Sequence, residues 1–146
     1  MPHVTVDFER LELRHGDHWI WQLHENQAYL GRTVVRLRRH TFGSLGDLTE
    51  PEWIALRSEI QSFERIITAV FQPDRFNYGQ LGNVYPQLHV HAVPRYASPR
   101  KWCGITFVDM NWGANWSPGP DSPLTLNQTF ELADWLRTNM QASVPS

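Results

Sequence analysis

The sequence predicts an α+β fold built on an antiparallel sheet. Two segments with strand character precede a long amphipathic segment, two more follow it, and a second amphipathic segment lies near the end of the chain. No strand–helix–strand unit repeats, so a parallel sheet with alternating helices is not indicated. The expected strands are 19–23, 29–37, 76–81 and 87–94, and the expected helices are 49–71 and 125–141.

The strand assignments rest on residue type and alternation. Segment 19–23 is rich in tryptophan and isoleucine, which favour strands. Segment 29–37 follows after a short turn, and its residues alternate between two faces, so the two segments form a predicted hairpin. Segment 87–94 is bounded by Pro86 and Pro94.

Both helix assignments rest on capping signals followed by an apolar stripe. Thr49 and Glu52 form a predicted capping box with Pro51 in the first turn, and Thr125 with Gln128 repeats the pattern. The residues expected to face the sheet from the first helix are Trp53, Leu56, Ile60, Phe63, Ile67 and Val70. Those of the second helix are Leu126, Phe130, Ala133, Leu136 and Met140.

Two stretches lack such periodicity. Residues 1–18 are polar and aperiodic, so we expect a short helix or an arm there. The stretch 95–123 is rich in glycine, proline and tryptophan and is longer than ordinary loops, which indicates a functional or partly structured segment. Its tryptophans are expected to line a pocket, to form an interface, or only to pack the tail onto the sheet; they are Trp102, Trp112 and Trp116.

The composition is that of one globular domain spanning residues 1–146. With 41% hydrophobic and 19% charged residues, the chain has enough apolar material for a core and too little charge for a disordered polymer. Its formal net charge of -2 offers no basic surface for nucleic acid or membrane partners. The single cysteine, Cys103, excludes an intramolecular disulfide and is expected to be a small buried residue. No signal-like or membrane-spanning apolar segment occurs, so we expect a cytoplasmic protein.

The chemically informative residues are Gln87, His89 and His91. Residues two apart on a strand share a face, so these three side chains project together while Leu88, Val90 and Ala92 face the core. A neutral imidazole is a competent nucleophile near pH 7 if its other ring nitrogen holds a proton against an acceptor. A second imidazole would bind phosphoryl oxygens or assist a leaving group. Gln87 cannot titrate, so it can only position its neighbours.

Amide side chains just upstream extend this polar set. Asn77, Gln80 and Asn83 lie on the neighbouring strand and its turn, where they would contact phosphate oxygens without adding charge. Two other interpretations stay open. Paired histidines on a strand also occur on plain solvent-exposed faces. A zinc site would need a third ligand, for which the chain offers His24 or His40.

The segment from Asn77 to Tyr96, which contains Gln-Leu-His-Val-His-Ala-Val-Pro-Arg, resembles the signature of the histidine triad superfamily of nucleotide hydrolases and transferases. In that resemblance Gln87 takes the first histidine position, His89 the second and His91 the third. The likeness covers a core of about residues 20–97, and 98–146 forms a C-terminal extension.

The resemblance implies a fold of about five antiparallel strands, one long central helix and a C-terminal helix, commonly in a homodimer. It implies that His89 attacks the α-phosphate of a nucleotide, purine as a first choice, and that His91 contacts the phosphate and assists the leaving group. No metal or other cofactor is required for that covalent step. Asn77 and Asn83 would match positions that hold phosphate and ribose oxygens.

The chain departs from the family pattern at two positions. Gln87 replaces the first histidine, and Arg32 replaces a further histidine that the family carries near the start of the strand after the first hairpin. An arginine there would bind phosphate with a permanent charge. With an incomplete motif, a nucleotide-binding protein with little catalysis is the main alternative to a hydrolase.

Overall fold

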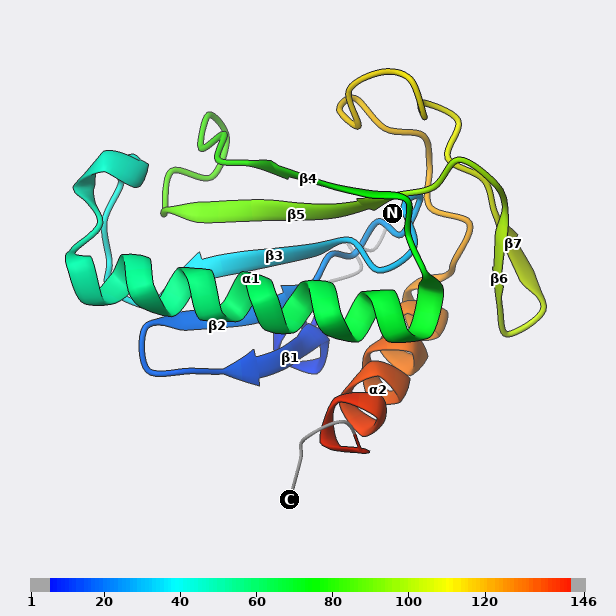
Figure 1. The fold of residues 1–146 in the computed structure, drawn as a ribbon, viewed down its shortest axis with the longest axis horizontal. Helices are drawn as coiled ribbons and strands as arrows, with labels where there is room; N and C mark the ends of the chain where they lie inside the picture. Colours follow the sequence, from blue (N-terminus) through cyan, green and yellow to red (C-terminus); the bar gives the residue numbers. More distant parts are fainter. Residues whose placement is uncertain (1–5, 143–146) are drawn as a thin grey trace.

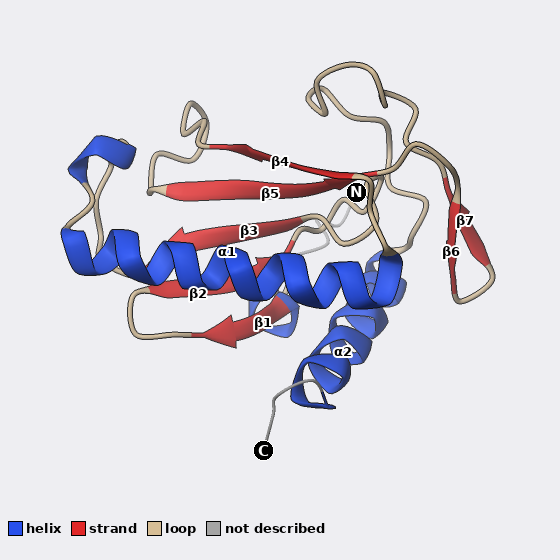
Figure 2. Cartoon of the chain, in the orientation of Figure 1, coloured by secondary structure: helices blue, strands red, loops and turns tan. Residues whose placement is uncertain are grey.

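The computed structural model describes residues 6–142 and has an α+β architecture. One antiparallel sheet has the strand order β1-β2-β3-β5-β4, and the long helix α1 lies across one of its faces (Figures 1 and 2). The strands of this sheet are β1 (Glu12–His15), β2 (Trp19–Leu23), β3 (Thr33–Leu37), β4 (Arg75–Gly79) and β5 (His89–Arg95). The helices are α1 (Glu50–Phe71) and α2 (Leu126–Ala142). The predicted fold class is confirmed.

Helix α1 begins where its capping chemistry predicts. The Thr49 hydroxyl accepts from the Glu52 backbone N–H, and the Glu52 carboxylate accepts from the Thr49 backbone N–H. The helix ends at Gln72, whose φ of 47° is left-handed.

The face of α1 that packs on the sheet is rotated from the predicted one. Trp53 was expected in the core but is 44% exposed, while Glu52 and Glu59 are buried. Glu52 turns inward because Arg39 binds its carboxylate through two hydrogen bonds. Leu56, Phe63 and Ile67 are buried as predicted, and Ile60 and Val70 pack at the margin of the core.

The polar N-terminal stretch adds the fifth strand. A 3-10 turn at Phe8–Leu11 leads into β1, which pairs with β2 at one edge of the sheet. Helix α2 packs against this turn and β1 and carries the predicted stripe, with Phe130, Ala133 and Leu136 buried. Residues 1–5 of the expected arm lie outside the described part of the chain.

The long stretch after β5 is partly structured, as predicted. It contains the hairpin β6 (Arg100–Trp102) and β7 (Ile105–Phe107), which stands beside the main sheet (Figure 1). Cys103 was expected to be buried, but it is exposed at the tip of this hairpin with a φ of 53°. Cys103 and Gly104 form the two-residue turn of the hairpin, and this position exposes the thiol to solvent. Among the described residues, none of the helices has the length and apolar character needed to cross a membrane.

Candidate active site

The paired histidines lie on the sheet face opposite the one that α1 covers. β5 runs between β3 and β4, and His89 and His91 are half-buried on its open side. Val90 and Ala92 point the other way and are buried in the core, as the two-residue strand period requires. The rings of the two histidines stand 5.1 Å apart, centroid to centroid, in an edge arrangement.

His89 is oriented by the backbone. Its Nδ1 lies 2.7 Å from the carbonyl oxygen of Gln87, which can only accept a hydrogen bond. Nδ1 therefore carries the proton, and Nε2 keeps its lone pair. This is the arrangement that a histidine nucleophile needs.

Gln87 has a different place from the one its strand position suggests. Its side-chain oxygen accepts from the Thr41 backbone N–H at 3.0 Å, and its nitrogen donates to the carbonyls of Leu37 and Arg39 at 2.9 Å each. The amide is thus committed to the loop after β3. Gln87, which we had grouped with the catalytic residues, fixes the start of β5 and the carbonyl that orients His89.

His91 is held neutral. Burial, then Arg32 and His89, lower its pKa to about 4. Its Nδ1 lies 3.5 Å from Arg32 Nη2, and because a guanidinium only donates, Nδ1 is the accepting nitrogen and Nε2 carries the proton. The structure therefore brings Arg32 and His91 together.

Arg32 is an uncompensated cation. Its Nε is buried without a hydrogen-bond partner, and no carboxylate pairs with it among residues 6–142. Burial lowers the pKa of the guanidinium, which nonetheless stays charged at neutral pH. A buried charge without a counter-ion favours the binding of an anion at this point.

A third imidazole joins the site from β2. The ring of His24 lies 5.9 Å from that of His91, and its Nδ1 accepts from the Asn26 backbone N–H at 2.9 Å. Burial, followed by Arg32 and His91, lowers the pKa of His24 to about 3. Sequence reasoning named His24 only as a possible zinc ligand, because nothing in the local pattern shows which strand ends meet.

The three amide residues are dispersed. Asn77 shares the open face, opposite Val93, but its side-chain oxygen accepts from Arg95 at 2.8 Å. Gln80 and Asn83 lie in the loop between β4 and β5, and no described contact joins either of them to the two histidines. Of the predicted phosphate-binding amides, only Asn77 therefore lies on the sheet face of the site.

The C-terminal extension borders the site. The indole of Trp116 packs over Gly79, which pairs with His91 across β4 and β5. Trp116 is buried, whereas Trp112 is 41% exposed. Trp116 therefore packs the tail onto the sheet and also forms a wall next to the histidine pair.

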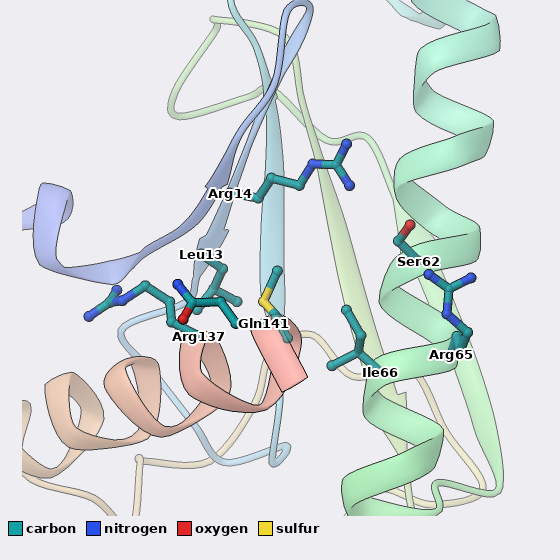
Figure 3. Close-up of a pocket in the computed structure, with 8 residues that line it drawn as sticks. Leu13, Arg14, Ser62, Arg65, Ile66, Arg137 and Gln141 are labelled. Atoms are coloured by element: carbon teal, nitrogen blue, oxygen red, sulfur yellow. The ribbon is translucent and has the colours of Figure 1, made fainter. Parts of the chain in front are cut away.

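Two hollows in the molecule lie away from the histidines. One, of about 310 Å³, lies between β1, α1 and α2 and includes Leu13, Ile66 and Arg137 (Figure 3). The other lies at the start of α1, near His18 and Ile54. The candidate active site is instead the open sheet face itself.

A metal centre finds no support in the side chains that the structure describes. Within residues 6–142 no group of three or more His, Cys, Asp or Glu side chains is placed to hold a metal ion. His40, one of the two candidates for a third ligand, is exposed and contacts the Phe42 ring in an edge arrangement.

The fold and site define an α+β protein that presents paired imidazoles and an arginine on one sheet face. No protein-family model matches the sequence, and no curated protein matches it. Solved structures do match. A histidine triad protein from Marinobacter aquaeolei VT8 has a TM-score of 0.67 at 21% identity, covering 93% of this chain and 96% of that chain. A histidine triad protein from Sinorhizobium meliloti 1021 has a TM-score of 0.66 at 19% identity, covering 88% of each chain.

A more distant relative in sequence matches equally well in structure. The diadenosine triphosphate hydrolase from Plasmodium falciparum has a TM-score of 0.67 at 12% identity, covering 98% of this chain and 88% of that chain. The chain has the histidine triad fold, as the resemblance of residues 77–96 predicted.

Proposed function

We propose that the chain is a nucleotide hydrolase or transferase that cleaves at a nucleoside α-phosphate through a nucleotidyl-histidine on His89. The observation that carries the proposal is the 2.7 Å contact between His89 Nδ1 and the Gln87 carbonyl. It leaves Nε2 as the attacking nitrogen, and it stabilises the positive charge that the ring gains when Nε2 bonds to phosphorus.

The neighbours of His89 supply the remaining parts of such a step. Arg32 offers a permanent positive charge for non-bridging phosphate oxygens. His91, with its proton on Nε2, offers a neutral hydrogen bond to the phosphate or to the departing group. These residues supply a nucleophile, a cation and a donor, so the proposed step requires no metal or other cofactor.

A nucleotide is the proposed substrate, with a purine as the first choice. One protein of the same fold is named a diadenosine triphosphate hydrolase, which supports this class. A homodimer, which the resemblance implies, stays a prediction.

Replacing the nucleophile tests the covalent mechanism. We expect His89→Ala to reduce turnover of a dinucleoside polyphosphate by several orders of magnitude while AMP binding stays nearly unchanged. Turnover is measured by chromatography of the products and binding by calorimetry. His40→Ala is the matched control, because His40 is exposed and its ring meets that of Phe42 edge-on, away from the histidine pair. Parental turnover in His89→Ala would rule out the mechanism.

A nucleotide-binding protein with little catalysis is the second candidate. The position of Gln87 favours it, because the amide that replaces a titratable histidine is committed to the backbone of the loop after β3. A radiolabelled adenylyl group trapped on the protein in a single turnover supports the hydrolase. Absence of label together with tight AMP binding supports the binding protein.

A further inference from the structure

Arg36 lies beside the proposed nucleophile. In the β3–β5 pairing Arg36 stands directly opposite His89, and Val34 stands opposite His91. Directly opposed residues share a face, with Cβ atoms about 4.5–5.5 Å apart. The half-buried side chain of Arg36 therefore starts from the open face, beside that of His89.

The charge of Arg36 has no counter-ion within the described chain. Arg36 makes no hydrogen bond or ion pair with another residue of 6–142, although its neighbours in sequence do. Arg38 donates to the carbonyls of Gly16 and Asp17, and Arg39 binds the Glu52 carboxylate. On β2 the residue opposite Arg36 is the apolar Ile20.

Arg36 and Arg32 place two cations on the open face, Arg36 beside His89 and Arg32 beside His91. They lie four residues apart, on β3 and just before it, so their Cα atoms are separated by about 13 Å along the strand. Arg32 lies at His91. A phosphoryl group held at the His89–His91 pair can be matched by Arg32, which leaves Arg36 for a second phosphate, so the two cations favour a ligand with more than one phosphate.

The neutral state of the His91 ring also favours a substrate whose leaving group is a phosphate. An amine leaves phosphorus only when an acid protonates it, and His91, whose pKa of about 4 keeps the ring neutral near pH 7, is a poor acid for that purpose. A phosphate leaving group has a pKa of about 6 and departs as an anion without that help. It needs cations nearby, which the arginines supply.

We propose that Arg36 binds the phosphates of the leaving group and selects nucleoside polyphosphates over substrates with a neutral leaving group. The inference rests on the function proposed above. The lone pair of His89 Nε2 forms the N–P bond while the P–O bond to the leaving group breaks, and the electron pair stays on the departing oxygen beside Arg36. Water then forms a new P–O bond, the N–P electron pair returns to Nε2, and the proton of the water passes to solvent.

Binding of inorganic tripolyphosphate tests the assignment without turnover. We expect Arg36→Gln to weaken tripolyphosphate binding at least tenfold in calorimetry and Arg36→Lys to recover part of the loss. Arg75→Gln is the matched control: Arg75 is exposed at the far end of β4, opposite Arg95, about 20 Å from His89 along β5. Unchanged affinity in Arg36→Gln, or an equal loss in Arg75→Gln, would overturn the inference.

Turnover tests the selectivity. We expect the ratio of kcat/KM for a dinucleoside triphosphate to that for an adenosine phosphoramidate to fall at least tenfold in Arg36→Gln. An unchanged ratio overturns the role of Arg36. If the parent protein hydrolyses neither compound but Arg36→Gln still loses tripolyphosphate affinity, the proposed hydrolase is wrong and the phosphate-binding role of Arg36 stands.

Discussion

Each imidazole of the site owes its tautomer to one neighbour. The Gln87 carbonyl puts the His89 proton on Nδ1, whereas the Asn26 backbone N–H keeps the His24 proton on Nε2. The Arg32 guanidinium, which can only donate a hydrogen bond to His91 Nδ1, likewise leaves the His91 proton on Nε2. Similar side chains thus receive different chemical roles from the backbone and from one cation.

The low pKa of His24 makes a prediction for stability. The unfolded chain binds this proton with the ordinary imidazole pKa of 6.5, and the folded chain binds it only near pH 3. Between these values the unfolded state holds more protons, so lowering the pH destabilises the fold by about 1.4 kcal/mol per pH unit from this group. We expect His24→Asn, which keeps an acceptor for the Asn26 N–H, to reduce this slope in urea unfolding between pH 6.5 and pH 4.

The control for this experiment is His40→Asn. His40 is exposed and should leave the pH dependence as it is in the parent protein. The same slope in His24→Asn and the parent protein would contradict the assignment of a buried neutral ring at His24.

At the residue scale, the sequence predicted what a single strand determines. The shared face of His89 and His91 follows from spacing alone. His24 was predicted only as a possible zinc ligand and Arg36 not at all, because their places depend on the register between strands that are far apart in the chain. The role of Gln87 depends on a loop almost fifty residues upstream, which no local pattern reveals.

At the scale of elements, local chemistry was predictable and long-range pairing was not. The start of α1 follows from Thr49 and Glu52, which lie three residues apart. Its buried face does not, because Glu52 is buried with Arg39 bound to its carboxylate, while Trp53 is exposed. Strand β1 was missed since Leu13 is its one buried residue, which leaves no alternating signal.

The contact between β4 and the C-terminal extension makes a prediction at this scale. A Cβ on Gly79 would lie 2.5 Å from a ring carbon of Trp116, an indole too deeply buried to move freely. We expect Gly79→Ala to lower the free energy of unfolding by about 1–3 kcal/mol, measured in urea, and to change kcat/KM because Gly79 pairs with His91. Gly113→Ala is the control, since no atom lies within 4 Å of its Cβ position. Equal stabilities of the two variants would show that Trp116 does not press on β4.

At the scale of the molecule, a buried ion pair helps to join the core that carries the motif to the C-terminal extension. The side chains of Arg95 and Asp109 are 3% and 0% exposed and meet at 2.7 Å. Arg95 also donates to Asn77 on β4 and to the Ala114 carbonyl in the tail. Arg95 therefore holds together β5, which carries the histidines, and the loop that borders the site.

Breaking the Arg95–Asp109 pair is expected to destabilise the whole chain, and not the C-terminal extension alone. Asp109→Asn removes the charge that compensates a fully buried guanidinium, and we expect a loss of about 3–5 kcal/mol, seen as a lower Tm for the whole chain in calorimetry. Asp134→Asn is the matched control, because Asp134 pairs with Arg137 at the surface of α2, where such pairs contribute about 0–1 kcal/mol. If Asp109→Asn instead melted the tail alone and left the sheet at its parental Tm, residues 98–146 would be an appendage. A single lowered transition would establish that the extension is part of the fold on which the histidines stand.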